Sequence, residues 1–140
     1  MKTLLPVLFA AVITVSCQKE VKNDCATNMQ NLAGTYKLTA LKYKANASAN
    51  EQDYLVYKDD CEKDDLIVLK SDGTFDYQDA GTSCTPNQND HGNWLLTGNT
   101  ITSDGMLDGI ITSFDCKTLV LYSPDIFVGG DKMIFTMTKQ

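Results

Sequence analysis

Five cysteines are the residues best suited to chemistry in this chain of 140 residues: Cys17, Cys25, Cys61, Cys84 and Cys116. Zinc sites space their cysteines about two to four residues apart, and no two of these cysteines lie that close. Thiols at wider spacing are typical of disulfides formed in an oxidising compartment. Because five is an odd number, one cysteine must have a different role.

Two other features have side chains that could act as catalysts or ligands. His91 is the only histidine, and its setting in Asn89-Asp90-His91-Gly92 is more typical of an exposed loop than of a general base or metal ligand, which needs converging partners. An acidic run could offer oxygens to calcium, but it lacks the spacing and central glycine of an EF-hand loop and is more typical of a solvated turn. This run contains Asp59, Asp60, Glu62, Asp64 and Asp65. We therefore expect no metal, no cofactor and no enzyme.

The N-terminus resembles the signal peptide of an exported lipoprotein. Lys2 precedes an apolar run, Leu4 to Val15, which is shorter than the roughly 20 residues that span a membrane but suits a signal peptide. Ser16 and Cys17 follow, and the segment resembles a lipobox, where lipoprotein signal peptidase cuts before a cysteine that carries acyl chains such as palmitate. We expect residues 1–16 to be removed and the lipid on Cys17 to anchor the protein, because two or more chains bind a membrane stably.

The other four cysteines allow three disulfide pairings. Cys61 and Cys84 flank one predicted hairpin, so we pair them. This leaves Cys25 to meet Cys116. Two disulfides agree with export to the cell envelope.

The charge of the chain excludes several classes of partner. The net charge is -6, and loss of Lys2 with residues 1–16 makes it -7, from 11 lysines against 18 acids, with no arginine. Nucleic acid phosphates and anionic lipid headgroups both require a basic patch. We therefore expect no nucleic acid partner, and contact with the membrane through the lipid rather than through the protein surface.

The remaining sequence predicts a polar tether followed by strands. Residues 17–30 have no apolar period and predict a flexible tether. From Gly34 onward apolar and polar residues alternate, with tight turns predicted at Asp72-Gly73 and Gly98-Asn99. The predicted strands cover residues 36–40, 65–70, 74–78, 94–96, 100–102, 110–114, 117–122 and 133–138. Eight sequential antiparallel strands favour an up-and-down meander, and closing it into a barrel removes its exposed edges.

Residues 45–58 interrupt the strand pattern. They predict a long connection, either with a helical turn that covers one end of the barrel or as a floppy insertion.

Several short motifs resemble a known family. They are Leu32-Ala33-Gly34-Thr35-Tyr36-Lys37-Leu38, Cys61-Glu62-Lys63-Asp64-Asp65, Asp72-Gly73-Thr74-Phe75, Cys84 and Gly92-Asn93-Trp94. In this order they resemble the lipocalin-like domains of lipoproteins from Gram-negative bacteria. The resemblance implies an all-β, eight-stranded lipocalin-like barrel over residues 31–140 and a Cys61–Cys84 bridge. Gln18-Lys19-Glu20 is similar to signals for the outer face of the outer membrane, so we expect an outer-membrane lipoprotein, periplasmic or surface-exposed.

The barrel interior is the best candidate for a binding site. Alternation places ten side chains inward: Tyr36, Leu38, Leu69, Phe75, Tyr77, Trp94, Leu96, Leu119, Leu121 and Phe135. An interior of eight strands is either filled by side chains or just wide enough for one small ligand. We expect a small apolar ligand in the barrel or, alternatively, contacts of the end loops at residues 45–58 and 82–90 with an envelope protein or a glycan.

Overall fold

The computed structural model describes residues 25–105 and 107–140. The predicted signal peptide, Cys17 and residues 17–24 of the predicted tether lie outside these residues. The described elements, in chain order, are α1 (Met29–Leu32), β1 (Gly34–Lys44), β2 (Gln52–Asp53), the short 3-10 helices η1 (Leu55–Tyr57) and η2 (Asp60–Glu62), β3 (Leu66–Leu69), β4 (Thr74–Gln78), β5 (Asp90–Thr97), β6 (Thr100–Ser103), β7 (Gly109–Phe114), β8 (Thr118–Pro124) and β9 (Lys132–Lys139).

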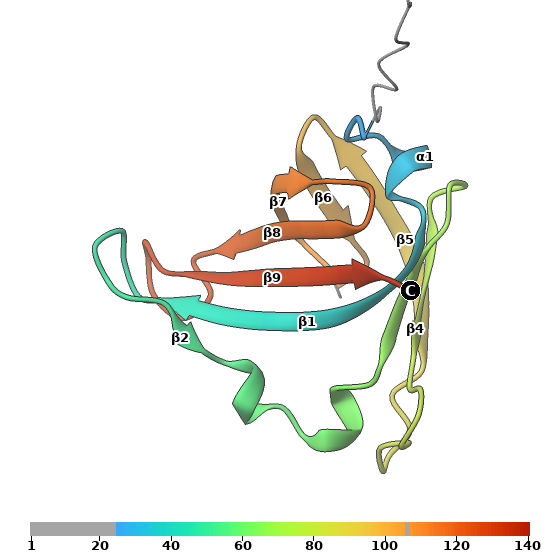
Figure 1. Cartoon of the computed structure of the whole chain (residues 1–140), viewed down its shortest axis with the longest axis horizontal. Coiled ribbons are helices and arrows are strands. Elements are labelled where there is room, and N and C mark those ends of the chain that lie inside the picture. Colours follow the sequence, from blue (N-terminus) through green and yellow to red (C-terminus); the bar gives the residue numbers. More distant parts are fainter. Residues whose placement is uncertain (1–24, 106) are drawn as a thin grey trace, which may run out of the picture.

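Eight of the strands close into an antiparallel barrel (Figure 1). From β3 to β9 each strand pairs with the next in the chain, while β1 pairs with β3 on one side and with β9 on the other. The β1–β9 pairing closes the barrel, and it joins residues near the start of the domain to residues near its end. The short strand β2 pairs with the far end of β1 and stays outside the ring. The structure therefore confirms the predicted all-β, eight-stranded up-and-down barrel.

A β-bulge in β1 changes which of its residues face the core. Leu38 pairs with Met137, but the next pair joins Ala40 to Thr136, so Thr39 is the extra residue. Because side chains alternate along a strand, one extra residue moves every later side chain to the other face. Tyr36 is buried before the bulge and Leu41 after it. The simple alternation of Tyr36, Leu38 and Ala40 therefore does not continue to the end of the strand.

The end of the barrel next to α1 is filled by packed side chains. Leu32 at the end of α1 is fully buried, and its carbonyl oxygen accepts a hydrogen bond of 2.7 Å from the buried Tyr36 hydroxyl. The indole N–H of Trp94 donates to the Lys70 carbonyl oxygen at 2.9 Å, so this large side chain is buried with its polar atom satisfied. The core cluster contains Leu32, Tyr36, Leu69, Phe75, Trp94, Ile101, Leu107, Ile111, Leu119, Leu121 and Met137.

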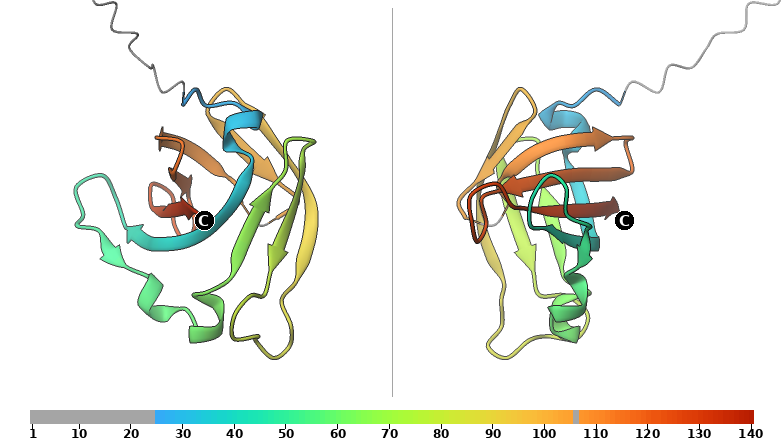
Figure 2. Two further views of the ribbon diagram at one scale, coloured as in Figure 1. Left: turned by 45° about the vertical axis from the view of Figure 1, so that its right-hand side comes forward. Right: turned by 90° about the vertical axis from the view of Figure 1, so that its left-hand side faces the viewer.

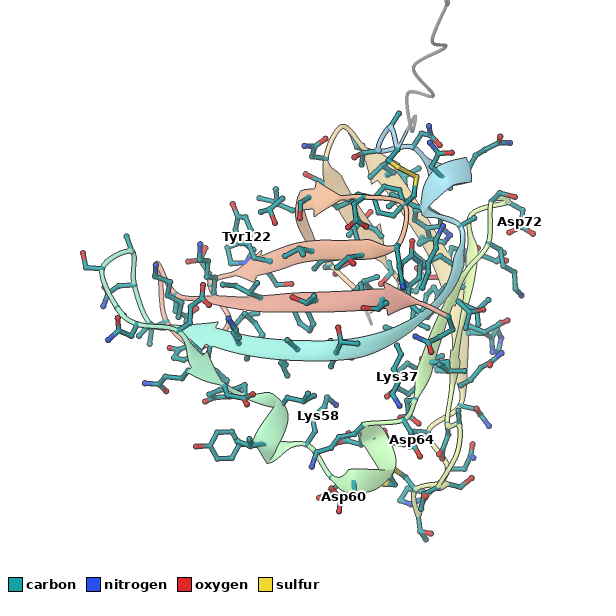
Figure 3. The ribbon with its side chains drawn as sticks, in the orientation of Figure 1. Lys37, Lys58, Asp60, Asp64, Asp72 and Tyr122 are labelled. Atoms are coloured by element: carbon teal, nitrogen blue, oxygen red, sulfur yellow. A yellow bond between two sulfur atoms is a disulfide. The ribbon has the colours of Figure 1, made fainter. Side chains whose placement is uncertain are left out.

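The segment that carries η1 and η2, residues 45–65, lies at the opposite end of the barrel from α1, as both views in Figure 2 show. This segment includes the predicted long connection at residues 45–58, which contains β2 and the helical turn η1. In Figure 3 Lys58 points from this segment toward the barrel, whereas Asp60 points away from it. The segment thus covers one end of the barrel.

Two disulfides tie the irregular segments to the barrel. Cys25 is bonded to Cys116 and Cys61 to Cys84, which are the pairs expected from the sequence. The first bond holds residue 25, within the predicted tether, against the turn between β7 and β8. The second joins η2 to the connection between β4 and β5. Each end of the barrel therefore carries one covalent link.

Aspartates close many of the turns and explain much of the acidic composition. The Asp72 carboxylate accepts the N–H of Thr74 in the turn between β3 and β4, and the Asp79 carboxylate accepts the N–H groups of Cys84 and Gln88. A short acidic side chain satisfies backbone donors that a tight turn leaves unpaired. These carboxylates have structural partners.

Asp131 has the largest set of such bonds and carries a testable prediction. Its two oxygens accept the N–H groups of Ile126, Phe127 and Val128 and the Tyr43 hydroxyl. In Asp131→Asn one acceptor becomes an NH₂ donor that faces other donors, so we expect Tm to fall by about 5 to 10 °C in a calorimetric scan. Asp60→Asn, whose side chain is 97% exposed, is the control. An equal Tm for both variants would contradict this account.

The same residue should contribute to the acid sensitivity of the fold. Burial alone would raise the pKa of Asp131, but hydrogen bonds from Val128 N–H and the Tyr43 hydroxyl outweigh it, so the pKa lies below the ordinary 3.8. A carboxyl group whose pKa is lowered by folding stabilises the fold above its unfolded pKa. This stabilisation is lost as the pH falls through the folded pKa. Stability of Asp131→Asn should therefore fall less steeply below pH 4 than that of the wild type.

Candidate functional site

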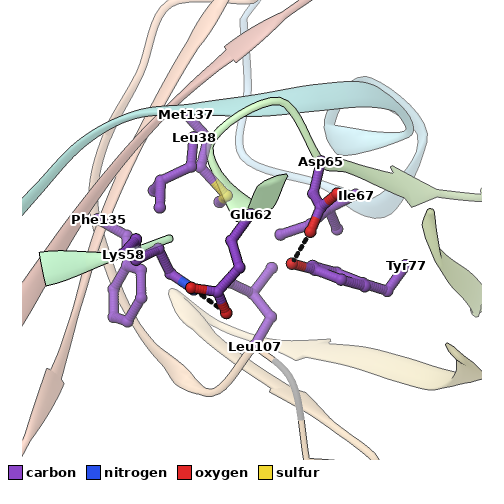
Figure 4. Close-up of a pocket in the computed structure, with 9 residues that line it drawn as sticks. All are labelled: Leu38, Lys58, Glu62, Asp65, Ile67, Tyr77, Leu107, Phe135 and Met137. Atoms are coloured by element: carbon purple, nitrogen blue, oxygen red, sulfur yellow. Dashed lines mark hydrogen bonds and ion pairs between the residues drawn. The ribbon is translucent and has the colours of Figure 1, made fainter. Parts of the chain in front are cut away.

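A small cavity lies between the barrel and the segment that carries η1 and η2 (Figure 4). Its volume is about 140 Å³. Its lining residues come from β1, β3, β4, β9, the η1–η2 segment and the connection between β6 and β7. They are Leu38, Lys58, Glu62, Asp65, Ile67, Tyr77, Leu107, Phe135 and Met137.

Five of these side chains form an apolar floor: Leu38, Ile67, Leu107, Phe135 and Met137. Leu38 on β1 and Met137 on β9 are direct partners across the closure of the barrel. Leu107 and Met137 also belong to the packed core. The apolar floor is therefore the surface of the core that faces the η1–η2 segment, and it is positioned by the same packing that stabilises the barrel.

The other four side chains form a polar wall, which begins with an ion pair. The Lys58 ammonium donates to Glu62, four residues further along the chain, at 3.2 Å. The second carboxylate oxygen of Glu62 accepts the Asp59 N–H at 3.1 Å and completes a capping box at the start of η2. Burial opposes ionisation of Glu62, but the Asp59 N–H and Lys58 lower its pKa below the ordinary value. Glu62 is therefore ionised at neutral pH.

Asp65 and Tyr77 complete the polar wall. Asp65 is only 5% exposed, and its two oxygens accept the Tyr77 hydroxyl at 2.6 Å and the Ala80 N–H at 3.1 Å. Burial and the neighbouring Asp65 raise the pKa of Tyr77 well above its ordinary value, so the phenol keeps its proton and donates. Both oxygens of this buried carboxylate thus have donors.

Three of the ten predicted inward residues line the cavity: Leu38, Tyr77 and Phe135. The other seven do not line it. Six of them, Tyr36, Leu69, Phe75, Trp94, Leu119 and Leu121, are buried in the core, and Leu96 packs against it. The interior is therefore filled in one part and hollow in another, so each of the two alternatives left open by the sequence describes part of the barrel.

The residues that sequence reasoning missed had weak signals or none. Met137 alternates with Phe135 and could have been found by the same rule. Ile67 lies in an uninterrupted apolar run, Leu66–Leu69, where alternation cannot distinguish the two faces. Lys58 and Glu62 lie in an irregular segment, and only its folding back over the barrel brings them to the cavity.

The other residues considered for chemistry have structural surroundings. His91 lies on β5 rather than in a turn, and its side chain is exposed. In the acidic run Asp60 pairs with Lys63, and Asp64 accepts the Thr82 N–H. Within residues 25–105 and 107–140 no group of three or more His, Cys, Asp or Glu side chains is arranged to hold a metal ion.

A second feature is an exposed tip made by η1 and the loop between β8 and β9. It consists of Val56, Tyr57, Ile126, Phe127 and Val128, which are all exposed. Two rings of the tip, Tyr57 and Phe127, pack with Tyr43 and Tyr54 in four ring pairs whose centroids lie 5.1 to 6.2 Å apart. Tyr57 is 76% exposed and Phe127 61%, so the tip presents apolar surface to solvent.

None of the helices that the structure describes is long and apolar enough to cross a membrane.

Comparison with known proteins gives one match. Neither a curated protein nor a solved structure matches the chain significantly. The family model for the lipocalin-like domain matches residues 32–121, which include β1 and most of the barrel up to β8. The chain therefore belongs to the lipocalin-like domain family.

Proposed function

We propose that this protein is a lipid-anchored lipoprotein of the outer membrane whose barrel binds a small apolar ligand in the cavity between the core and the η1–η2 segment. One observation carries the binding part, namely a cavity of about 140 Å³ with an apolar floor and a small polar wall. Sites for small molecules are concave, mostly apolar and equipped with a few polar groups that orient the ligand. The polar groups here already have partners, which favours binding over catalysis.

Filling the cavity should weaken binding without unfolding the barrel. Leu38→Phe adds volume at the apolar floor, so we expect it to lower the affinity for toluene by at least about tenfold. Methyl NMR of Ile67 and Met137 during titration measures the affinity, and Ile67→Phe, followed through Met137 alone, is a second filling variant. Leu95→Phe, at a residue that is 56% exposed, is the control. Absence of toluene binding to the wild type would contradict the proposed function.

The anchor is proposed from the sequence and is compatible with the described fold. The lipobox-like segment ends at Cys17, and the two disulfides agree with an extracytoplasmic location. Cys25 lies four residues before α1, and the chain from Cys17 to Cys25 can span at most about 28 Å. A membrane reached by this short segment would face the α1 end, while the cavity would face away from it.

Replacing Cys17 tests the anchor. We expect Cys17→Ala to lose incorporation of labelled palmitate and either to leave the membrane fraction or to retain residues 1–16. Ser16→Ala keeps a small residue before the cysteine and should remain lipidated. A processed Cys17→Ala protein that still sediments with outer membranes would contradict the proposal, and protease treatment of intact cells distinguishes the periplasmic from the surface-exposed location.

The exposed tip favours a second candidate function, an interaction module for an envelope protein or a glycan. It includes part of the predicted contact loop at residues 45–58, and exposed apolar residues on a rigid scaffold commonly mark a contact surface. The double variant Tyr57→Ser and Phe127→Ser should then lose a partner that the wild type retains in cross-linked envelopes. Leu95→Ser is the control. Equal cross-linking of both variants would contradict this candidate.

A further inference from the structure

The charges of the polar wall do not balance. It contains two carboxylates, Glu62 and Asp65, and one ammonium group, Lys58. From this imbalance and the cavity volume we propose that the ligand is a compact molecule of one-ring size that carries no negative charge. The inference rests on the proposed ligand-binding function and adds the size and the charge of the ligand.

The Lys58–Glu62 pair neutralises itself, so the remaining charge belongs to Asp65. Lys58 contacts Glu62 at 3.2 Å, which cancels most of the field of both groups at the cavity. Asp65 has hydrogen-bond donors from Tyr77 and Ala80 but no cation within the described ion pairs. Its negative charge therefore acts on whatever occupies the cavity.

An anionic ligand would be opposed in two ways. At an effective dielectric constant of about 20, a second negative charge about 6 Å from Asp65 weakens binding on the order of a hundredfold. To pair with Lys58 instead, a ligand carboxylate would have to compete with Glu62, which the Asp59 N–H holds in place. A neutral or cationic head group has neither disadvantage and can accept or donate at the polar wall.

The volume limits the ligand to about one ring. A cavity of about 150 Å³ lined by aliphatic and aromatic side chains is known to hold one benzene molecule. The present cavity, at about 140 Å³, is of the same size. A long acyl chain exceeds this volume, so most of the chain of a fatty acid would lie outside the cavity.

Three ligands of matched size separate charge from shape: benzyl alcohol, benzylammonium and benzoate. We expect titration of the disulfide-bonded protein at pH 7, followed by methyl NMR of Leu38, Ile67 and Met137, to show benzyl alcohol and benzylammonium bound at the apolar floor. Benzoate should bind at least about tenfold more weakly than either. The ratio of the benzoate affinity to the benzyl alcohol affinity is the measured quantity.

Two variants of the ion pair should move this ratio in opposite directions. Glu62→Gln removes one negative charge and should raise the relative affinity for benzoate by at least about threefold, whereas Lys58→Gln should lower it by a similar factor. A purely structural effect would change the affinities for all three ligands together and leave the ratio constant. Lys63→Gln is the control, because Lys63 pairs with Asp60 outside the cavity lining.

The possible outcomes separate the two proposals. Benzoate binding as tightly as benzyl alcohol, or a ratio that does not respond to Glu62→Gln and Lys58→Gln, would overturn the charge inference and leave ligand binding intact. Failure of all three ligands to bind would overturn the proposed function, and the charge inference with it.

Discussion

Replacing Cys25 and Cys116 together by alanine is expected to lower the free energy of unfolding by about 4 to 5 kcal/mol. The two cysteines are 91 residues apart, and a cross-link stabilises a fold mainly by restricting the unfolded chain, more so when it closes a longer loop. The loop closed by Cys25 and Cys116 contains most of the barrel. Urea denaturation followed by circular dichroism measures the effect.

The second disulfide is the matched comparison. Cys61 and Cys84 are 23 residues apart, so the same model gives a loss of about 3 kcal/mol for their replacement by alanine. This pair ties η2 over the cavity, and we also expect its removal to weaken ligand binding more than removal of Cys25–Cys116. A larger loss of stability for the shorter loop would show that restriction of the unfolded chain is not the main effect of these bonds.

Leu119→Ala is expected to cost about 3 to 4 kcal/mol of unfolding free energy. Leu119 on β8 is fully buried, and it lies between its partners Phe114 on β7 and Met137 on β9. Removing its side chain loses apolar contacts and leaves a hole that the hydrogen-bonded ring of strands cannot close by moving inward.

The control for the core is Leu95→Ala on the outer face of β5, where the side chain is 56% exposed. Surface changes of this kind usually alter stability by less than about 0.5 kcal/mol. Urea denaturation of both variants gives the comparison directly. A loss below about 1 kcal/mol for Leu119→Ala would contradict a tightly packed core at the α1 end.

The barrel thus combines a filled part with a hollow part. At the α1 end Leu32 and Tyr36 plug the interior, and Cys25–Cys116 holds the entering chain there. At the other end the η1–η2 segment covers the barrel without filling it, and the cavity lies between this segment and the core. Rigid packing on the core side of the cavity and a disulfide beside it keep the binding groups in place, which reduces the ordering that a ligand must impose.

The strands could be predicted from the sequence because their signals are local. Period-two alternation and the turn residues Asp72-Gly73 and Gly98-Asn99 depend only on neighbours in the chain. The predicted hairpin between Cys61 and Cys84 also allowed the disulfide pairing to be predicted. Bulges are different, because an extra residue such as Thr39 is recognised only from its partner strand. This is why Leu41 was missed as a core residue.

What the sequence determined by itself is therefore the barrel, its strand order and the cysteine that remains after two disulfides are formed. Cys17, first seen as one of five reactive residues, keeps its proposed role as the lipid anchor from this count. The tertiary structure alone decided which inward residues pack and which line a cavity. It also placed Lys58, Glu62 and Asp65 against apolar side chains from β1, β3 and β9. A charge pattern over a cavity of this kind arises when segments distant in the chain fold together, and no periodicity in the chain encodes that contact.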